Sequence, residues 1–231
     1  MAVAFDVATA GETSAAGTTL SFNHTNNGGS DRFLLVCVFL RGGVSGAVST
    51  VKYGGSDLTY MDWNNSGTTI RLEAWKLLTP ATGTNAVDIV TADTWQIIAA
   101  TALSYTGVDL NDPHTSPLDG AAANSNAVST GPYTSATGQK VIDMAVQKRD
   151  NDADGFAGNA GAGQTVRNSG SATSSTQWMH WGVSEKDGAA SVTMTWAPGQ
   201  NNVWSTLMVG LKPSAGGIVK LGHGMIGRNW G

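Results

Sequence analysis

The feature that most constrains this chain is its lack of helix-forming stretches. No segment with helical periodicity reaches ten residues without a glycine or several β-branched residues. The composition agrees, because 30 residues are glycine and only three are glutamate, whereas helix-rich proteins draw heavily on Glu, Lys and Arg. Short runs rich in Val, Thr and Trp alternate with Gly, Asn, Asp and Pro. The sequence therefore predicts an all-β protein.

Thirteen segments have the length and residue types of β-strands. So many strands at this spacing must pack as sheets or close into a barrel. We expect a two-sheet antiparallel β-sandwich of the jelly-roll type. The predicted strands are residues 3–7, 18–24, 32–40, 48–53, 58–63, 69–77, 86–91, 96–105, 140–147, 164–168, 177–184, 190–196 and 203–212.

The run from Phe33 to Leu40 is apolar at every position, so this strand is expected to be central and covered on both faces. Cys37 lies inside the run and is expected to be a small buried hydrophobic residue. Because it is the single cysteine, an internal disulfide and a CxxC metal site are excluded. Residues 108–130 and 150–163 are expected to be loops.

The net charge and the length of the apolar runs limit the partners that the chain can have. The net charge is −4, which argues against a nucleic-acid binder, because such a protein needs a basic face. The longest apolar run is far shorter than the ~20 residues that span a bilayer, so no membrane partner is expected. The first residues have neither a basic region nor a long apolar region, so no secretory signal peptide is expected.

Three motifs occur in a fixed order along the chain: YGG-x-x-LT at 53–59, W-x-L-x-x-P-x-x-G-T at 75–84 and SYTGV at 104–108. Together they resemble a family of concanavalin-like jelly-roll β-sandwich domains. That family occurs in bacteriophage virion proteins, including capsid decoration and tail-associated proteins, and in bacterial proteins of uncertain role. The resemblance covers residues 3–213 and implies a β-sandwich fold in a virion protein.

The most specific local motif is an acidic run in the second expected loop, DNDADG at 150–155. Carboxylates at alternate positions before a glycine can converge on a calcium ion when the chain bends. An EF-hand is excluded, because its twelfth position would be Gly161 and its flanks are expected to be strands. Two interpretations stay open: a calcium loop formed by Asp150, Asp152 and Asp154, or an acidic surface turn.

The sequence contains no set of residues with the spacing of a known catalytic site. A glycosidase needs two opposed carboxyl groups ~5–9 Å apart across a groove, and Glu73 and Glu185 are the plausible glutamate pair. The E-x-D-x-x-E signature of laminarinase-like sandwiches and the G-x-S-x-G nucleophile elbow are both missing. Trp178 and His180 share one strand face, where a partly buried histidine is favoured over a ligand platform. We therefore expect no enzymatic activity.

A sugar-binding module is the alternative function, because exposed aromatic side chains on one sandwich face can stack on sugar rings. Most tryptophans in such sandwiches fill the core, so exposure decides between the two roles. The candidates are Trp63, Trp95, Trp178 and Trp204.

After Pro213 the composition changes. A short Ser-Ala-Gly-Gly linker precedes a segment without acidic residues in which apolar residues are spaced by glycines. Ordering this segment costs roughly 1–2 kcal/mol per residue, which burial of its apolar side chains only about balances. A partner surface can supply the missing hydrogen bonds. We therefore divide the chain into a sandwich, 1–213, and a C-terminal anchoring arm, 214–231, whose expected contact residues are Ile218, Leu221, Met225, Ile226, Arg228 and Trp230.

The residues and the resemblance together favour a non-enzymatic bacteriophage structural protein. The expected role is that of a capsid decoration or cement protein on the virion, anchored by the arm to the major capsid protein or another virion protein. Virion proteins are repeated by symmetry, so a homo-oligomer is expected. The alternative is a lectin-like module that binds a surface glycan.

Overall fold

The computed structural model describes residues 1–42, 46–67, 69–115, 118–149, 155–175 and 177–215. Within these residues all regular structure is β, with sixteen strands that pair antiparallel throughout. No helix of the described part is long and apolar enough to cross a membrane. The predicted all-β antiparallel sandwich is therefore confirmed.

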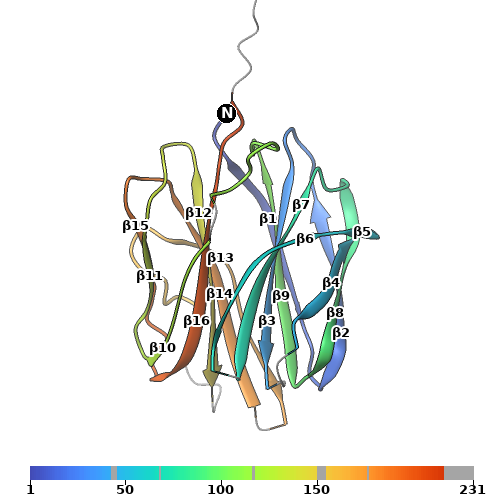
Figure 1. The fold of residues 1–231 in the computed structure, drawn as a ribbon, viewed down its shortest axis with the longest axis vertical. Helices are drawn as coiled ribbons and strands as arrows, with labels where there is room; N and C mark the ends of the chain where they lie inside the picture. Colours follow the sequence, from blue (N-terminus) through green and yellow to red (C-terminus); the bar gives the residue numbers. More distant parts are fainter. Residues whose placement is uncertain (43–45, 68, 116–117, 150–154, 176, 216–231) are drawn as a thin grey trace, which may run out of the picture.

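The strands form four sheets that stand side by side in Figure 1. At the right lies the β8 sheet, with β2 (Gly17–Asn26), β8 (Gly83–Trp95), β4 (Val48–Tyr53) and β5 (Ser56–Asp57). Next is the β3 sheet, with β1 (Ala4–Glu12), β9 (Ile97–Thr106), β3 (Phe33–Arg41), β7 (Ile70–Leu78) and β6 (Thr59–Ser66).

The other two sheets complete the stack toward the left of Figure 1. The β12 sheet contains β10 (Asp119–Ser125), β16 (Asn202–Leu211), β12 (Lys140–Arg149), β14 (Gln177–Asp187) and β13 (Thr165–Ser174). The β15 pair consists of β11 (Val128–Tyr133) and β15 (Val192–Trp196). Four hydrogen-bonded sheets thus take the place of the expected two.

Strand β3 explains why the stack has more than two layers. It lies between β9 and β7 and is buried along its whole length, as its continuous apolar run predicts. Phe33, Leu35, Cys37 and Phe39 pack toward the β12 sheet. The alternate residues, 34 to 40, pack toward the β8 sheet. A strand that is apolar on both faces needs a covering sheet on each side, because side chains alternate along a strand.

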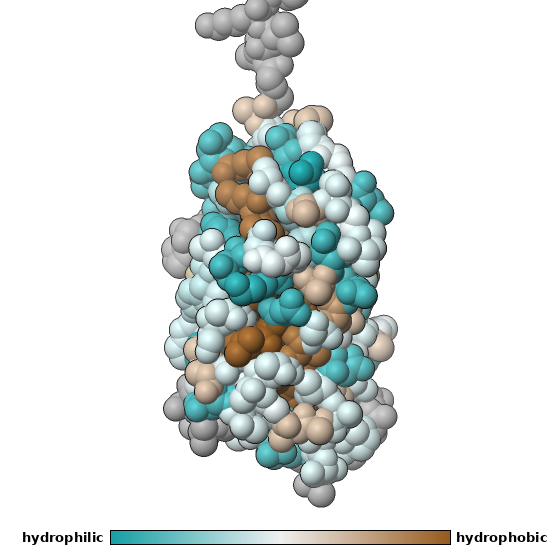
Figure 2. Space-filling view, turned by 90° about the vertical axis from the view of Figure 1, so that its right-hand side faces the viewer, coloured by the Kyte–Doolittle hydropathy of each residue, from teal (hydrophilic) through white to brown (hydrophobic). Residues whose placement is uncertain are grey.

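The outermost layers are covered on one face only. Two smaller clusters, around Trp196 and around Met194, join the β15 pair to the β12 sheet. The free face of the β8 sheet is turned toward the viewer in Figure 2, where hydrophilic and neutral residues surround separate hydrophobic patches. Exposed polar pairs such as Ser21 with Asp88 (2.6 Å) and Thr25 with Thr84 (2.7 Å) cross this face.

Each of the thirteen predicted strands overlaps an observed one, but the expected loop at 108–130 is wrong in part, because it contains β10 and the start of β11. Gly120 and three alanines give β10 a weak strand signal. Pairing with β16 forms the strand nevertheless. A Cβ at Gly120 would lie 2.9 Å from the Thr206 carbonyl oxygen, so glycine permits this close approach. The described part of the second expected loop, 155–163, contains no strand.

The N-terminus and residue 214 meet at one pole of the sandwich, the top of Figure 1. The Met1 amino group donates to the Ser214 carbonyl at 3.0 Å, and the Ser214 amide donates to the Gly107 carbonyl at 2.8 Å. The last strand ends at Leu211. The proposed arm contacts Ile218, Leu221, Met225, Ile226, Arg228 and Trp230 lie outside the described residues.

Candidate functional site

The acidic run carries the only metal-binding prediction, and Asp150, Asp152 and Asp154 lie outside the described residues. Among the residues that the structure describes, no group of three or more His, Cys, Asp and Glu side chains is placed to hold a metal ion. The calcium interpretation therefore stays a prediction.

A calcium titration separates the two interpretations of this run. We expect millimolar calcium to leave the melting temperature unchanged, because a solvated acidic turn has no converging ligand set. Asp152→Ala should then be neutral as well. A rise of the melting temperature that disappears in Asp152→Ala would show calcium binding to the folded state by mass action and would establish the calcium loop.

The two glutamates considered as a glycosidase pair do not face each other. Glu73 is fully buried and accepts hydrogen bonds from the Val48 amide (3.1 Å), Arg71 Nε (2.6 Å) and Trp75 Nε1 (3.1 Å). These partners place its carboxylate between the β3 and β8 sheets. A carboxylate with three donors in a closed interior holds the fold together and has no access to a polymer.

Glu185 lies in the other large interior, between the β3 and β12 sheets. Its carboxylate contacts Arg167 Nη2 (2.6 Å), Lys140 Nζ (3.3 Å) and the Tyr105 hydroxyl (3.0 Å). The β3 sheet therefore separates Glu73 from Glu185, and the arrangement of an acid and a nucleophile across a groove is not present. Burial raises the pKa of Tyr105, with the charge of Glu185 adding to the shift.

Cys37 is fully buried in the core between the β3 and β12 sheets, as predicted. Burial raises the pKa of its thiol, and the charge of Asp143 adds to the shift. A thiol that stays protonated and has no access to solvent is neither a nucleophile nor a metal ligand.

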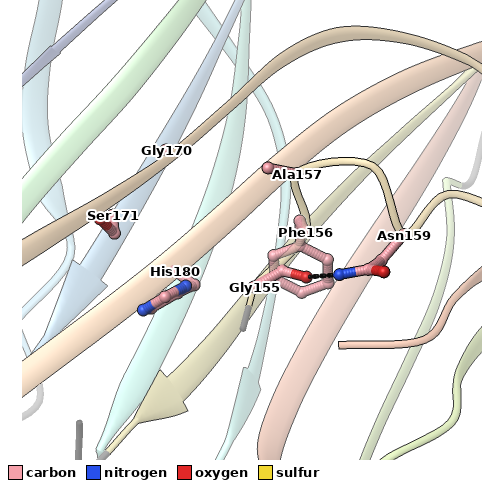
Figure 3. Close-up of a pocket in the computed structure, with 7 residues that line it drawn as sticks. All are labelled: Gly155, Phe156, Ala157, Asn159, Gly170, Ser171 and His180. Carbon is pink, nitrogen blue, oxygen red and sulfur yellow. Dashed lines mark hydrogen bonds between the residues drawn. The ribbon is translucent and has the colours of Figure 1, made fainter. Parts of the chain in front are cut away.

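A pocket of about 510 Å³ opens beside His180 on strand β14 (Figure 3). A Cβ at Gly155 would lie 2.3 Å from His180 Nδ1, and a Cβ at Gly170 would lie 2.3 Å from Trp181 Cζ2, so both walls depend on glycine. The Asn159 amide closes the turn by donating to the Gly155 carbonyl at 2.5 Å. The described lining residues are Gly155, Phe156, Ala157, Asn159, Gly170, Ser171 and His180.

The chemistry of this pocket is limited in the described part of the chain. Ser171 stands directly opposite His180 in the β13–β14 pair. None of the described lining residues is a carboxylate that would orient the histidine. His180 is only 4% exposed, which agrees with the partly buried histidine expected from the sequence.

A second pocket, of about 310 Å³, lies between residues 126–129, 159–161 and 195–197. Its described lining is mostly apolar and small, and no lining residue titrates. This pocket therefore offers shape and no acid–base chemistry.

His24 forms a buried chain with two hydroxyl groups, Thr9 Oγ1 at 2.6 Å and Ser104 Oγ at 2.7 Å. Burial lowers the pKa of His24 to about 4, against a smaller opposing effect of the Asp6 charge. Ser104 and His24 are both closed off from solvent, so this serine–histidine contact joins strands β1, β2 and β9 rather than acting on a substrate.

Asp143 is buried between the β12 sheet and the β15 pair. Its Oδ2 accepts a hydrogen bond from Trp196 Nε1 at 2.5 Å, while Oδ1 has no hydrogen-bond partner among the described residues. Burial raises the pKa of this carboxyl to about 7, although hydrogen bonds from Trp196 and Thr130 oppose the shift. The pKa of Asp143 therefore lies near neutral pH, although the carboxyl group is in a closed interior.

The four tryptophans proposed as sugar-stacking candidates separate clearly in the structure. Trp95 and Trp204 are buried core residues, and Trp178 is half-buried. Trp63 on β6 is 42% exposed. Exposure therefore leaves Trp63 as the strongest of the four for a binding role.

A second exposed aromatic residue, Tyr60, lies on the same strand and is 41% exposed. Residues three apart normally point to opposite faces of a strand, but β6 has a bulge between Tyr60 and Asp62. Tyr60 pairs with Trp75 and Trp63 pairs with Glu73, so both rings lie on one face, roughly 7 Å apart along the strand. We call Tyr60, Trp63 and Asn65 on this face the β6 strip.

The sequence alone indicates only one of the two aromatic residues of the β6 strip. Trp63 was a candidate, whereas Tyr60 was not, because a regular strand would place it on the opposite face. The signal for a bulge is the spacing itself, since two aromatic residues three apart break the period of two.

No protein-family model, curated protein or solved structure matches this chain.

Proposed function

We propose that the chain is a non-enzymatic structural protein of a bacteriophage particle, displayed on the particle surface as a β-sandwich and attached through its C-terminal segment. The motifs that resemble virion β-sandwich domains have structural roles, which supports the first part. In the YGG motif, Gly54 and Gly55 have φ of 55° and 82° and form the turn between β4 and β5. The buried Tyr53 hydroxyl donates to the carbonyls of His24 (3.3 Å) and Gly83 (3.1 Å).

The observation that carries the proposal is that the sandwich is closed before the C-terminal segment begins. Strand β16 ends at Leu211, Pro213 bridges Val108, and Ser214 is tied to Gly107 and Met1. Each described strand of the four layers therefore has its pairing partner within residues 1–215. The segment that follows carries apolar residues and a tryptophan, which suit it to bind another protein.

The described residues also support a role without catalysis. Glu73 and Glu185 are buried carboxylates that are each satisfied by several donors, and Cys37 is buried in the core. The exterior carries few charges, since charged residues make up 13% of the chain. Particle proteins are repeated by symmetry, so we expect a homo-oligomer or a symmetric array.

Deletion of residues 216–231 tests the attachment. We expect the truncated chain to keep its melting temperature within about 2 °C, because no described strand loses a partner. We expect the same deletion to abolish binding to purified particles in a sedimentation assay. Trp230→Ala should weaken binding more than any other single substitution in the segment, since aromatic residues dominate interface energies.

Trp63→Ala serves as the matched control for this experiment, because it removes a tryptophan from the sandwich surface. It should leave attachment unchanged. Full occupancy of particles by the truncated chain would mean that attachment uses the sandwich, and the anchoring role of the segment would be wrong.

A further inference from the structure

The β6 strip differs from an accidental exposure of aromatic residues, because each ring packs against a side chain of the neighbouring strand β7. The Tyr60 ring packs edge-on against Trp75, with ring centroids 5.4 Å apart at 73°. The Arg71 guanidinium lies over the Trp63 ring, 4.0 Å from its centroid. Both rings are therefore fixed before any ligand arrives, which lowers the entropic cost of binding.

Arg71, which lies over the Trp63 ring, is itself held by residues of the core. Arg71 Nε donates to Glu73 Oε1 at 2.6 Å, and the same carboxylate is fixed by Trp75 and the Val48 amide. The side chain of Arg71 is 14% exposed and that of Glu73 is fully buried. Arg71 is thus held in one position by an internal ion pair, and its charge is balanced within the protein.

The strip also offers hydrogen-bonding groups beside the rings. Asn65 is exposed and follows Trp63 by two residues, so its amide lies on the same face. Burial, together with the charges of Glu73 and Asp62, raises the pKa of Tyr60 to about 12. The phenol therefore keeps its proton at neutral pH and can both donate and accept a hydrogen bond.

The surroundings do not suit a protein partner. Among the described residues few large hydrophobic side chains are exposed: Tyr60 and Trp63 on β6, and Met1, Val90 and Val166 on other segments. A protein interface needs a contiguous apolar centre, which two isolated rings between polar side chains do not provide. A ligand built of rings with flat C–H faces and with hydroxyl groups at the ring edges matches the strip better. The aromatic rings of Trp63 and Tyr60 can stack on such faces, and the polar groups of the strip can hydrogen-bond the hydroxyl groups.

We propose that the β6 strip is a binding site for a neutral glycan chain, whose sugar rings stack on Trp63 and Tyr60 while Asn65 and the Tyr60 hydroxyl bind sugar hydroxyls. The ligand is neutral because Arg71, the cation at the strip, is already paired with Glu73. This deepens the sugar-binding alternative suggested by the sequence and is independent of how the C-terminal segment attaches.

The test uses the full chain and a panel of neutral hexasaccharides: cellohexaose, xylohexaose, maltohexaose and chitohexaose. Tryptophan fluorescence and calorimetry report binding. We expect at least one probe to bind. Trp63→Ala should lower the affinity for that probe by tenfold or more, in line with the contribution of one stacked ring. Tyr60→Ala should lower the affinity by a smaller factor. Val90→Ala, an exposed substitution on the β8 sheet, is the matched control and should bind like the parent chain.

Arg71→Lys tests the positioning of Trp63, because it keeps the charge and removes the planar group over the ring. We expect a shifted tryptophan emission in the free protein and weaker binding of the same probe. If Trp63→Ala does not fold, Trp63→Phe takes its place and should retain part of the affinity.

Three results would overturn the proposal. The first is that no hexasaccharide of the panel binds. The second is that the Tyr60→Ala/Trp63→Ala double variant binds as well as the parent chain. The third is that the double variant changes the oligomeric state in light scattering, which would make the strip a contact between copies. Loss of attachment after deletion of residues 216–231 is a separate readout, so the two proposals can fail independently.

Discussion

Replacing Phe39 by alanine should lower the free energy of unfolding by about 3–5 kcal/mol, the cost of emptying a buried aromatic site. Phe39 is fully buried near the centre of the stack, and its ring stacks on Trp181 with centroids 6.2 Å apart at 22°. The contact joins the β3 sheet to the β12 sheet. Its loss therefore weakens the junction between the two inner layers rather than one sheet alone.

Urea unfolding measures this effect, with Val90→Ala as the control on the exposed face of the β8 sheet. The control should change stability by no more than about 0.5 kcal/mol. A loss below about 1 kcal/mol for Phe39→Ala would mean that the two inner sheets do not share a continuous core, and the layered arrangement would be wrong.

The second large effect concerns pH, and two buried groups act in opposite directions. The pKa of Asp143 rises from 3.8 to about 7 on folding. A raised carboxyl pKa gives stability that is complete below the unfolded value and is lost as the pH rises through the folded value. At about 1.4 kcal/mol per pKa unit, the loss on raising the pH through this range is roughly 4 kcal/mol.

His24 has the opposite sign. Its pKa falls from 6.5 to about 4 on folding, so its stabilising effect is complete above the unfolded value and is lost as the pH falls toward the folded value. The corresponding loss is roughly 3 kcal/mol. Between pH 4 and 6.5 the slopes from Asp143 and His24 therefore oppose each other, and their contributions to the parent chain nearly cancel.

Single substitutions should expose each slope. Relative to the parent chain, Asp143→Asn should gain stability as the pH rises from 4 to 7, and His24→Gln should lose stability as the pH rises from 4 to 6.5. Urea unfolding at half-unit pH steps measures both differences, and the other titrating groups cancel because all three chains share them. If either variant tracks the parent chain at every pH, the assigned protonation state of that residue is incorrect.

Much of the fold is readable from the sequence because the strongest signals are local. The uninterrupted apolar run of β3 predicts a strand covered on both faces, and the structure places it at the centre of its sheet. Strand β10 was missed because alanine and glycine carry little strand propensity, and its pairing with β16 depends on residues about 85 positions away.

The candidate site depends on features that local patterns do not contain. Whether Trp63 or Trp204 is exposed depends on which sheet covers which face, and that is decided by packing between distant strands. Tyr60 joins Trp63 only through the bulge in β6. The internal partners of Glu185 come from β9, β12 and β13, so its structural role is invisible in the sequence around it.

The claim that this chain is a particle protein is tested most directly by density-gradient sedimentation of a lysate that contains both the chain and assembled phage particles. Quantitative mass spectrometry of the fractions then follows the chain and the capsid protein together. The proposed function predicts that the chain sediments with the particles at a constant ratio to the capsid protein. Recovery of the chain only in the soluble fractions at the top of the gradient would contradict it.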